Sequence, residues 1–158
     1  MIHLEDEEIF NECIRLAKMS NCSLVQFGSA IVKDRKILGR GYNVSLTGEC
    51  KPCLKGEGYK LSTNPGLCYA VHSEWMALLD AINKHGFKKV KGSTLYIAGL
   101  KNKKDFLIWE GFTCTVCIRL LKYAGISKVR SFKGNYSREY TIDEAWNFAF
   151  KYIKKYNK

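Results

Sequence analysis

Apolar side chains recur along the chain with two different periods. A spacing of three to four residues, typical of amphipathic helices, covers residues 5–19, 73–85, 116–124 and 141–155. Short apolar runs that are typical of strands cover residues 27–32, 37–42, 93–98 and 128–132. We therefore expect a single domain over residues 1–158, with an α/β fold in which helices flank a mixed sheet of four or five strands.

Two segments interrupt this pattern. In residues 43–69 the apolar side chains follow no helical or strand periodicity, and the segment contains several glycines and both prolines. A loop of this length is uncommon in a compact domain unless it has a function. Between residues 99 and 111, a polar turn at 101–105 precedes the β-prone run 106–109, which predicts an extra hairpin that delivers Phe112 and Thr113 to a site. Both segments are expected to serve function.

Composition narrows the class of protein. The hydrophobic content of 46% indicates a compact globule, and no apolar run approaches the length of a membrane span. The acidic N-terminus lacks the features of a signal peptide, and the odd number of cysteines, seven, favours metal ligation in a reducing cytoplasm over disulfides. The net charge of +11 rests mostly on scattered lysines, so nucleic acid is a possible partner but a weaker one than a small anionic substrate.

One pair of motifs carries the chemistry. His72-Ser73-Glu74 opens one predicted helix, and Cys114-Thr115-Val116-Cys117 opens another. One imidazole and two thiolates provide three zinc ligands and leave the fourth tetrahedral position open, which is typical of a catalytic zinc. Glu74 then lies beside the metal without being needed as a ligand, which suits a proton carrier.

The order His-x-Glu followed by Cys-x-x-Cys resembles the zinc-dependent cytidine and deoxycytidylate deaminase superfamily, and the long segment between Asn43 and His72 is most similar to the deoxycytidylate deaminases. The resemblance implies a three-layer α/β/α fold. It also implies hydrolytic deamination of a cytosine nucleotide, dCMP to dUMP or a close relative, by zinc-activated water. In that reaction His72, Cys114 and Cys117 would hold Zn²⁺ and Glu74 would shuttle protons.

The resemblance implies further site residues. Asn43 would bind the sugar, the backbone around Ser73 and Thr113 would read the exocyclic amine, and Tyr136, expected in the loop after the fourth strand, would line the base. A second, structural zinc is expected at cysteines grouped in or near the long loop: Cys22, Cys50, Cys53 and Cys68. We also expect a homo-oligomer.

Two other functions remain open. A deaminase of tRNA or single-stranded nucleic acid would need an open, basic groove beside the metal. A zinc-stabilised interaction module without activity would use both metal sites only to hold the fold, but such a module has no use for the unliganded Glu74. Ammonia release from a panel of nucleotides, nucleosides and oligonucleotides would separate these functions.

Overall fold

The computed structural model describes residues 4–48, 68–106, 113–133 and 136–156. Its elements follow the chain in this order: α1 (Leu4–Met19), β1 (Val25–Lys33), β2 (Lys36–Tyr42), β3 (Val44–Ser45), β4 (Ala70–Val71), α2 (Ser73–His85), α3 (Phe87–Val90), β5 (Thr94–Lys101), β6 (Asp105–Phe106), α4 (Thr115–Tyr123), β7 (Lys128–Lys133), β8 (Tyr136–Thr141) and α5 (Ile142–Tyr156). The four long helices and the four main strands predicted from the pattern are all present.

The main sheet is mixed, with the strand order β2-β1-β5-β7-β8 and the short β6 paired to β5. β1 pairs antiparallel with β2 and with β5, while β5 and β7 are parallel, with Thr94 opposite Lys128. The parallel pair is the one expected for two strands joined through a helix, here α4. The mixed sheet confirms the predicted fold class.

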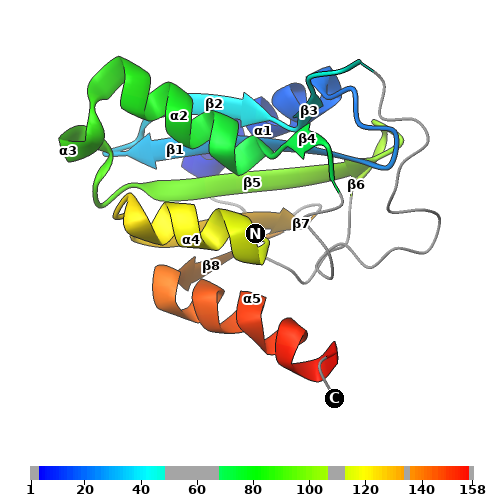
Figure 1. Ribbon diagram of the computed structural model, residues 1–158. Helices are drawn as coiled ribbons and strands as arrows, with labels where there is room; N and C mark the ends of the chain where they lie inside the picture. Colours follow the sequence, from blue (N-terminus) through cyan, green and yellow to red (C-terminus); the bar gives the residue numbers. More distant parts are fainter. Residues whose placement is uncertain (1–3, 49–67, 107–112, 134–135, 157–158) are drawn as a thin grey trace.

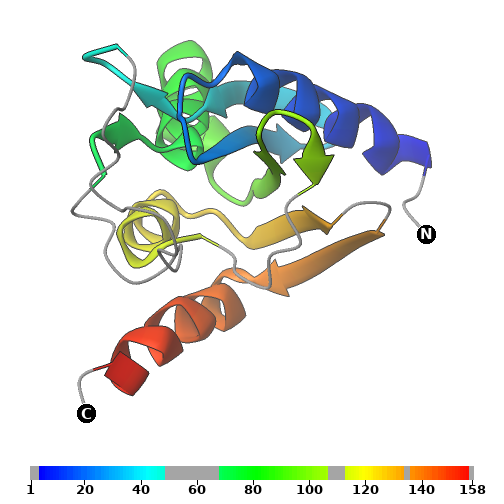
Figure 2. The same ribbon diagram turned by 90° about the vertical axis from the view of Figure 1, so that its right-hand side faces the viewer.

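Helices cover both faces of this sheet and make three layers (Figures 1 and 2). α1 packs on one face, where Cys13 joins Ala30 and Tyr96 in an apolar cluster. α2, α4 and α5 pack on the other face, where the larger cluster gathers Ile31, Leu78, Leu95, Ile118, Val129 and Ala145. Since side chains alternate along a strand, β1 contributes to both clusters, with Ala30 facing α1 and Ile31 facing α2.

Two glycines let helices approach the sheet closely. A Cβ atom at Gly28 would lie 1.9 Å from the carbonyl oxygen of Cys13 in α1. A Cβ atom at Gly41 would lie 2.3 Å from the carbonyl oxygen of Ser73, the first residue of α2. Any side chain at Gly41 would therefore push the start of α2 away from β2.

The helix ends match local signals in the sequence. α5 begins with a capping box, in which Thr141 Oγ1 accepts from the Glu144 backbone N–H (3.2 Å) and Glu144 accepts from the Thr141 N–H (2.8 Å). α2 ends at His85, and the following Gly86 has a φ of 77°, a positive value that glycine adopts at no steric cost. These ends fix the length of both helices.

Three details differ from the sequence-based expectation. The prediction that Tyr136 lies in a loop is wrong, because Tyr136 is the first residue of β8 and pairs with Lys133 of β7. The alternation in Tyr136–Thr141 is a strand signal that the neighbouring helix obscured. Part of the expected loop forms the β3-β4 pair, with Ser45 opposite Ala70, and α3 was not anticipated.

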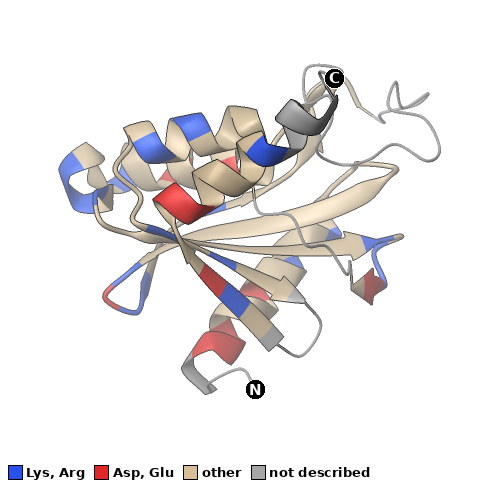
Figure 3. Ribbon diagram, turned by 90° about the horizontal axis from the view of Figure 1, so that it is seen from below, with Lys and Arg blue, Asp and Glu red and all other residues tan. Residues whose placement is uncertain are grey.

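The predicted hairpin after β5 is present in its described part, where Leu100 pairs with Phe106. Figure 3 shows that lysines and arginines are spread over helices, strands and turns rather than gathered on one element. Within the described ranges, no helix has both the length and the apolar character needed to cross a membrane.

Candidate active site

The N-termini of α2 and α4 meet at one end of the sheet (Figure 1). His72 is the residue immediately before α2 and has an extended backbone conformation, while Cys114 occupies the same position before α4. Cys117 lies one turn into α4, so that Cys114 and Cys117 face the same side of that helix. Three side chains from two helix starts thus converge, as their spacing predicted.

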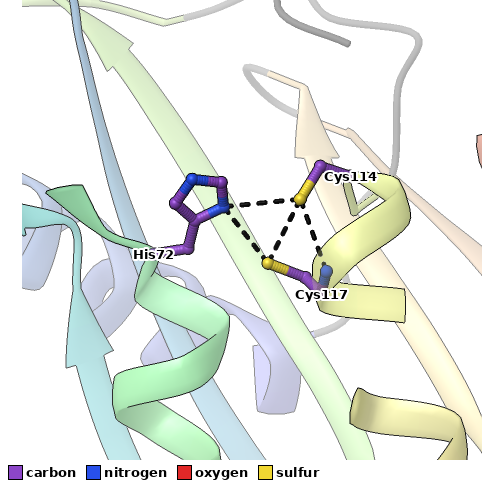
Figure 4. A group of neighbouring side chains, drawn as sticks. All are labelled: His72, Cys114 and Cys117. Atoms are coloured by element: carbon purple, nitrogen blue, oxygen red, sulfur yellow. Dashed lines mark hydrogen bonds between the residues drawn. The ribbon is translucent and has the colours of Figure 1, made fainter. Parts of the chain in front are cut away.

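Figure 4 shows how the three side chains point toward one another. His72 Nδ1 lies 3.2 Å from Cys117 Sγ and 3.4 Å from Cys114 Sγ, and the two sulfur atoms are 3.3 Å apart. Among the described residues, these three form the one group of potential metal ligands with three or more members. The predicted ligands therefore share a single centre.

The donor set fits a tetrahedral zinc ion. With Zn–S of about 2.3 Å and Zn–N of about 2.0 Å, two ligand atoms in a tetrahedral site are separated by about 3.5–3.8 Å. The three separations in the protein are within a few tenths of an ångström of that range. Side-chain rotations without backbone movement would open the triangle enough, and the fourth position would remain for another ligand.

The two thiols differ in their protonation. A hydrogen bond from the Cys117 thiol, together with one from His72, lowers the pKa of Cys114 to about 4 despite its burial. Burial raises the pKa of Cys117 well above its ordinary value, and the neighbouring Cys114 thiolate adds to the effect. One thiolate is therefore ready for a metal, and binding would release the proton of the other.

The His72 side chain is hydrogen-bonded to two cysteines, Cys114 and Cys68. Burial disfavours its charged form, but hydrogen bonds to Cys114 and Cys68 outweigh burial and raise its pKa to about 10. Cys68 thus lies against a ligand of the cluster, just before β4. A metal ion would require the neutral imidazole, so binding would displace a proton here too.

Glu74 is almost fully buried, with 6% of its surface exposed. Its carboxylate accepts a hydrogen bond from Ser73 Oγ (3.2 Å), and the Cys117 side chain lies nearby. Burial raises the pKa of Glu74, while the nearby His72 charge opposes that rise. A buried carboxyl group with a raised pKa beside three potential metal ligands is suited to proton transfer.

The residues expected to bind substrate lie in different environments. Ser73 and Thr113 are buried beside the ligands. Asn43 is also buried, but its amide bridges the backbone of β1: Oδ1 accepts from the Phe27 N–H (2.7 Å) and Nδ2 donates to the Val25 carbonyl (2.9 Å). Its role in sugar binding stays a prediction, as does the role of the Tyr136 side chain, which lies outside the described side chains.

The second metal site is only partly within the described residues. Cys50 and Cys53 lie outside them. Cys22 is buried and follows Asn21, whose side chain bonds the Ser45 carbonyl (3.0 Å), and Ser45 pairs with Ala70 two residues after Cys68. Cys22 and Cys68 therefore lie near the two ends of the segment that carries the other two cysteines.

Ser29 of β1 is a site residue that the motifs did not reveal. Its hydroxyl lies 2.8 Å from Ser73 Oγ, and both residues are fully buried. A polar residue between Phe27 and Ile31, on the face of the strand that packs on α2, was the available signal.

Solved structures of two deaminases share this fold. One is the dCMP deaminase from the cyanophage S-TIM5 in complex with dCMP and dUMP, with a TM-score of 0.54, 24% identity and 83% of each chain covered. The other is a cytidine deaminase from Burkholderia pseudomallei, with a TM-score of 0.57, 17% identity, and 92% of this chain and 96% of that chain covered. At these identities the likeness concerns the fold.

Two sequence relatives are deoxycytidylate deaminases. The protein from Mycobacterium phage D29 is 29% identical over 132 residues, which cover 78% of this chain and 91% of the relative. The protein from Saccharomyces cerevisiae is 29% identical over 146 residues, which are 87% of this chain but only 38% of the relative. The family model described as the cytidine and deoxycytidylate deaminase zinc-binding region matches residues 4–133, the part of the chain that carries all three ligands and Glu74, and the chain belongs to that family.

Proposed function

We propose that the protein hydrolyses the exocyclic amine of a cytosine nucleotide, deoxycytidylate in the first place, and releases ammonia and the corresponding uracil nucleotide. The observation that carries the proposal is the unliganded, buried Glu74 beside the His72, Cys114 and Cys117 triangle. Three ligands with an adjacent free carboxylate suit hydrolysis, whereas a purely structural zinc is closed by four protein ligands. The two deoxycytidylate deaminase relatives support the choice of substrate.

Metal binding and proton transfer are assigned to different residues. Zn²⁺ held by His72, Cys114 and Cys117 would lower the pKa of a water molecule from about 15.7 toward about 7. Glu74 takes a proton from the attacking water and delivers it to ring N3 as the C4–O bond forms; it then takes the second proton from the C4 hydroxyl and transfers it to the amine, which leaves as ammonia when the C4–N bond breaks. The raised pKa of Glu74 favours this cycle, because it makes the carboxylate a better acceptor of the water proton.

Substrate contacts are proposed for four residues. The backbone at Ser73 and Thr113 would face the exocyclic amine, since both residues are buried next to metal ligands. Asn43 would contact the sugar with the amide proton that its bridge to Val25 leaves free, and Tyr136 would line the base.

A second, structural zinc at Cys22, Cys50, Cys53 and Cys68 remains part of the proposal, supported by the position of Cys22 and Cys68 near the ends of one segment. We also propose a homo-oligomer, supported by the exposed apolar side chains of Leu79 on α2 and Tyr123 on α4.

The cytoplasm is the proposed compartment, because oxidation of the free Cys114 and Cys117 would destroy the site.

The decisive experiment measures ammonia release from deoxycytidylate, cytidylate, deoxycytidine, single-stranded oligonucleotides and tRNA, with Glu74→Gln as the inactive control. We expect turnover of deoxycytidylate, weaker turnover of the uncharged nucleoside, and none of the polymers. Activity should depend little on salt, because a monophosphate site engages one phosphate, whereas a polynucleotide site releases many counterions. Salt-sensitive turnover of oligonucleotides with deoxycytidylate untouched would assign the protein to the nucleic-acid branch.

A further inference from the structure

Two buried hydroxyl groups connect Glu74 to the central sheet. Ser29 lies in β1 and Ser73 is the first residue of α2, and neither has measurable solvent exposure. Their Oγ atoms are 2.8 Å apart, and Ser73 Oγ donates to Glu74 Oε2 at 3.2 Å. The three side chains thus form a continuous hydrogen-bonded chain, which we call the serine chain.

The direction of the serine chain follows from counting protons. A hydroxyl group has one proton to donate, and Ser73 uses its own toward the carboxylate. The bond between the two serines must then run from Ser29 to Ser73. Ser29 therefore anchors Ser73, and Ser73 anchors one of the two oxygens of Glu74.

Packing alone does not account for these hydroxyls. Ser29 occupies the strand face that Ile31 and Phe27 share, where a small apolar side chain would fill the space without the cost of burying a polar group. The Ser73 hydroxyl does not cap α2 either, because the cap residue is His72 and makes no side-chain cap bond. Both hydroxyls are instead directed at each other and at Glu74.

The anchor is rigid at both ends. β1 is a central strand, paired with β2 on one side and β5 on the other. The Ser73 carbonyl lies directly over Gly41, so the first turn of α2 is pressed against β2. A carboxylate tied to such a frame through Oε2 cannot swing freely.

We propose that Ser73, oriented by Ser29, is a positioning residue that holds the Glu74 carboxylate in the orientation needed for proton transfer. The proposal deepens the proposed deaminase function and rests on it for the kinetic part only. A small misplacement of a catalytic group costs a large factor in rate, whereas removal of the Ser73 hydroxyl leaves in place the backbone that is proposed to face the substrate.

The kinetic test compares Ser73→Ala, Ser29→Ala and the double variant. We expect Ser73→Ala to lower kcat about ten- to a hundred-fold with KM nearly unchanged. Ser29→Ala should have a smaller effect, and the double variant should be no slower than Ser73→Ala, because both substitutions break one chain. Zinc content should stay at the wild-type level in all three.

Ser93→Ala is the matched control. Ser93 is also buried, and its hydroxyl has no hydrogen-bond partner among the described residues. Removal of a buried hydroxyl as such should therefore leave kcat unchanged in this variant. If Ser73→Ala behaves like Ser93→Ala, with full kcat per zinc-loaded molecule, the positioning role is wrong.

A second readout does not need activity. High-resolution crystal structures of chelator-treated wild type and Ser73→Ala should show one ordered Glu74 carboxylate in the former and a rotated or multiply oriented one in the latter. An unchanged Glu74 in Ser73→Ala would overturn the proposal even if the rate fell. If wild type deaminates none of the nucleotides, the proposed function fails, while this structural comparison still decides whether the serine chain holds Glu74.

Discussion

The two faces of the sheet each bury a carboxylate, and the two carboxylates are treated differently. Asp6 of α1 is 7% exposed and Glu74 of α2 is 6% exposed. Asp6 is ion-paired with the Arg130 guanidinium of β7 and accepts a hydrogen bond from Tyr96 Oη of β5 at 3.3 Å. Glu74 instead accepts from a neutral donor, the Ser73 hydroxyl.

In the proposed function, this difference separates a structural acid from a chemical one. The ion pair of Asp6 with the Arg130 guanidinium and its bond from Tyr96 tie α1 to two strands. The Ser73 hydroxyl is a neutral donor, and burial raises the pKa of Glu74. A carboxylate that has to gain and lose a proton in each turnover requires the second arrangement.

The largest effect should come from the ligand set. Cys117→Ala removes one of three ligands, and we expect loss of zinc and of all measurable ammonia release. The matched control is Cys13→Ala on the opposite face, where Cys13 is equally buried and contacts the Tyr96 carbonyl oxygen. Elemental analysis should find zinc in the control but not in Cys117→Ala. Equal zinc content in both variants would contradict the assignment of the site.

Glu74→Gln tests the proposed role of Glu74 in proton transfer. The amide keeps the size of the side chain but cannot carry the proton, so kcat should fall about 10²- to 10⁴-fold. Zinc content and the thermal unfolding midpoint should stay close to wild type, because Glu74 is neither a ligand nor part of an ion pair that holds two layers together. Near wild-type turnover would exclude Glu74 as the proton carrier.

Asp6→Asn tests the structural acid with the same kind of substitution. Loss of the charge leaves Arg130 with Glu139 as its one acidic partner among the described residues, and we expect the free energy of unfolding to fall by about 1–3 kcal/mol. Activity per folded molecule should be unchanged. Denaturant unfolding and kcat measured together distinguish the two acids: Glu74→Gln should change the rate, and Asp6→Asn the stability.

A third carboxylate, Glu12, extends the comparison to the surface. A hydrogen bond from Arg15 and a second from Arg40 lower the pKa of Glu12 from 4.5 to about 2. Because the folded pKa is depressed, this contribution to stability is present above about pH 4.5 and is lost as the pH falls toward 2. Both arginines are well exposed, so the contribution should be about 1 kcal/mol or less.

The measurement is the difference in unfolding free energy between wild type and Glu12→Gln across this pH range. The difference should shrink as the pH falls, and higher salt should reduce it at neutral pH. A difference that stays constant from pH 6 to pH 2.5 would show that the ion pairs of Glu12 contribute nothing measurable.

The sequence was most informative where the signal is local. His72, Glu74, Cys114 and Cys117 were recognised because their spacing of two or three residues places them together at the start of a helix, whatever the rest of the chain does. The helix limits were predictable for the same reason, since the Thr141 capping box and Gly86 act within one turn. β8 was missed because a six-residue strand next to a strong helix signal is ambiguous.

Contacts between segments that are distant in the sequence could be identified only from the tertiary structure. Ser29 and Ser73 are 44 residues apart, Cys114 and His72 are 42 apart, and Asp6 and Arg130 are 124 apart. No period or spacing encodes these pairs, because they depend on the strand order that brings β1 under α2, and α1 over β5 and β7. The sequence by itself therefore determined which chemistry the chain carries. Only the fold decided that Asp6 is ion-paired with Arg130 and that Ser29 reaches Ser73 beside Glu74, because these partners come from elements that are remote in the sequence.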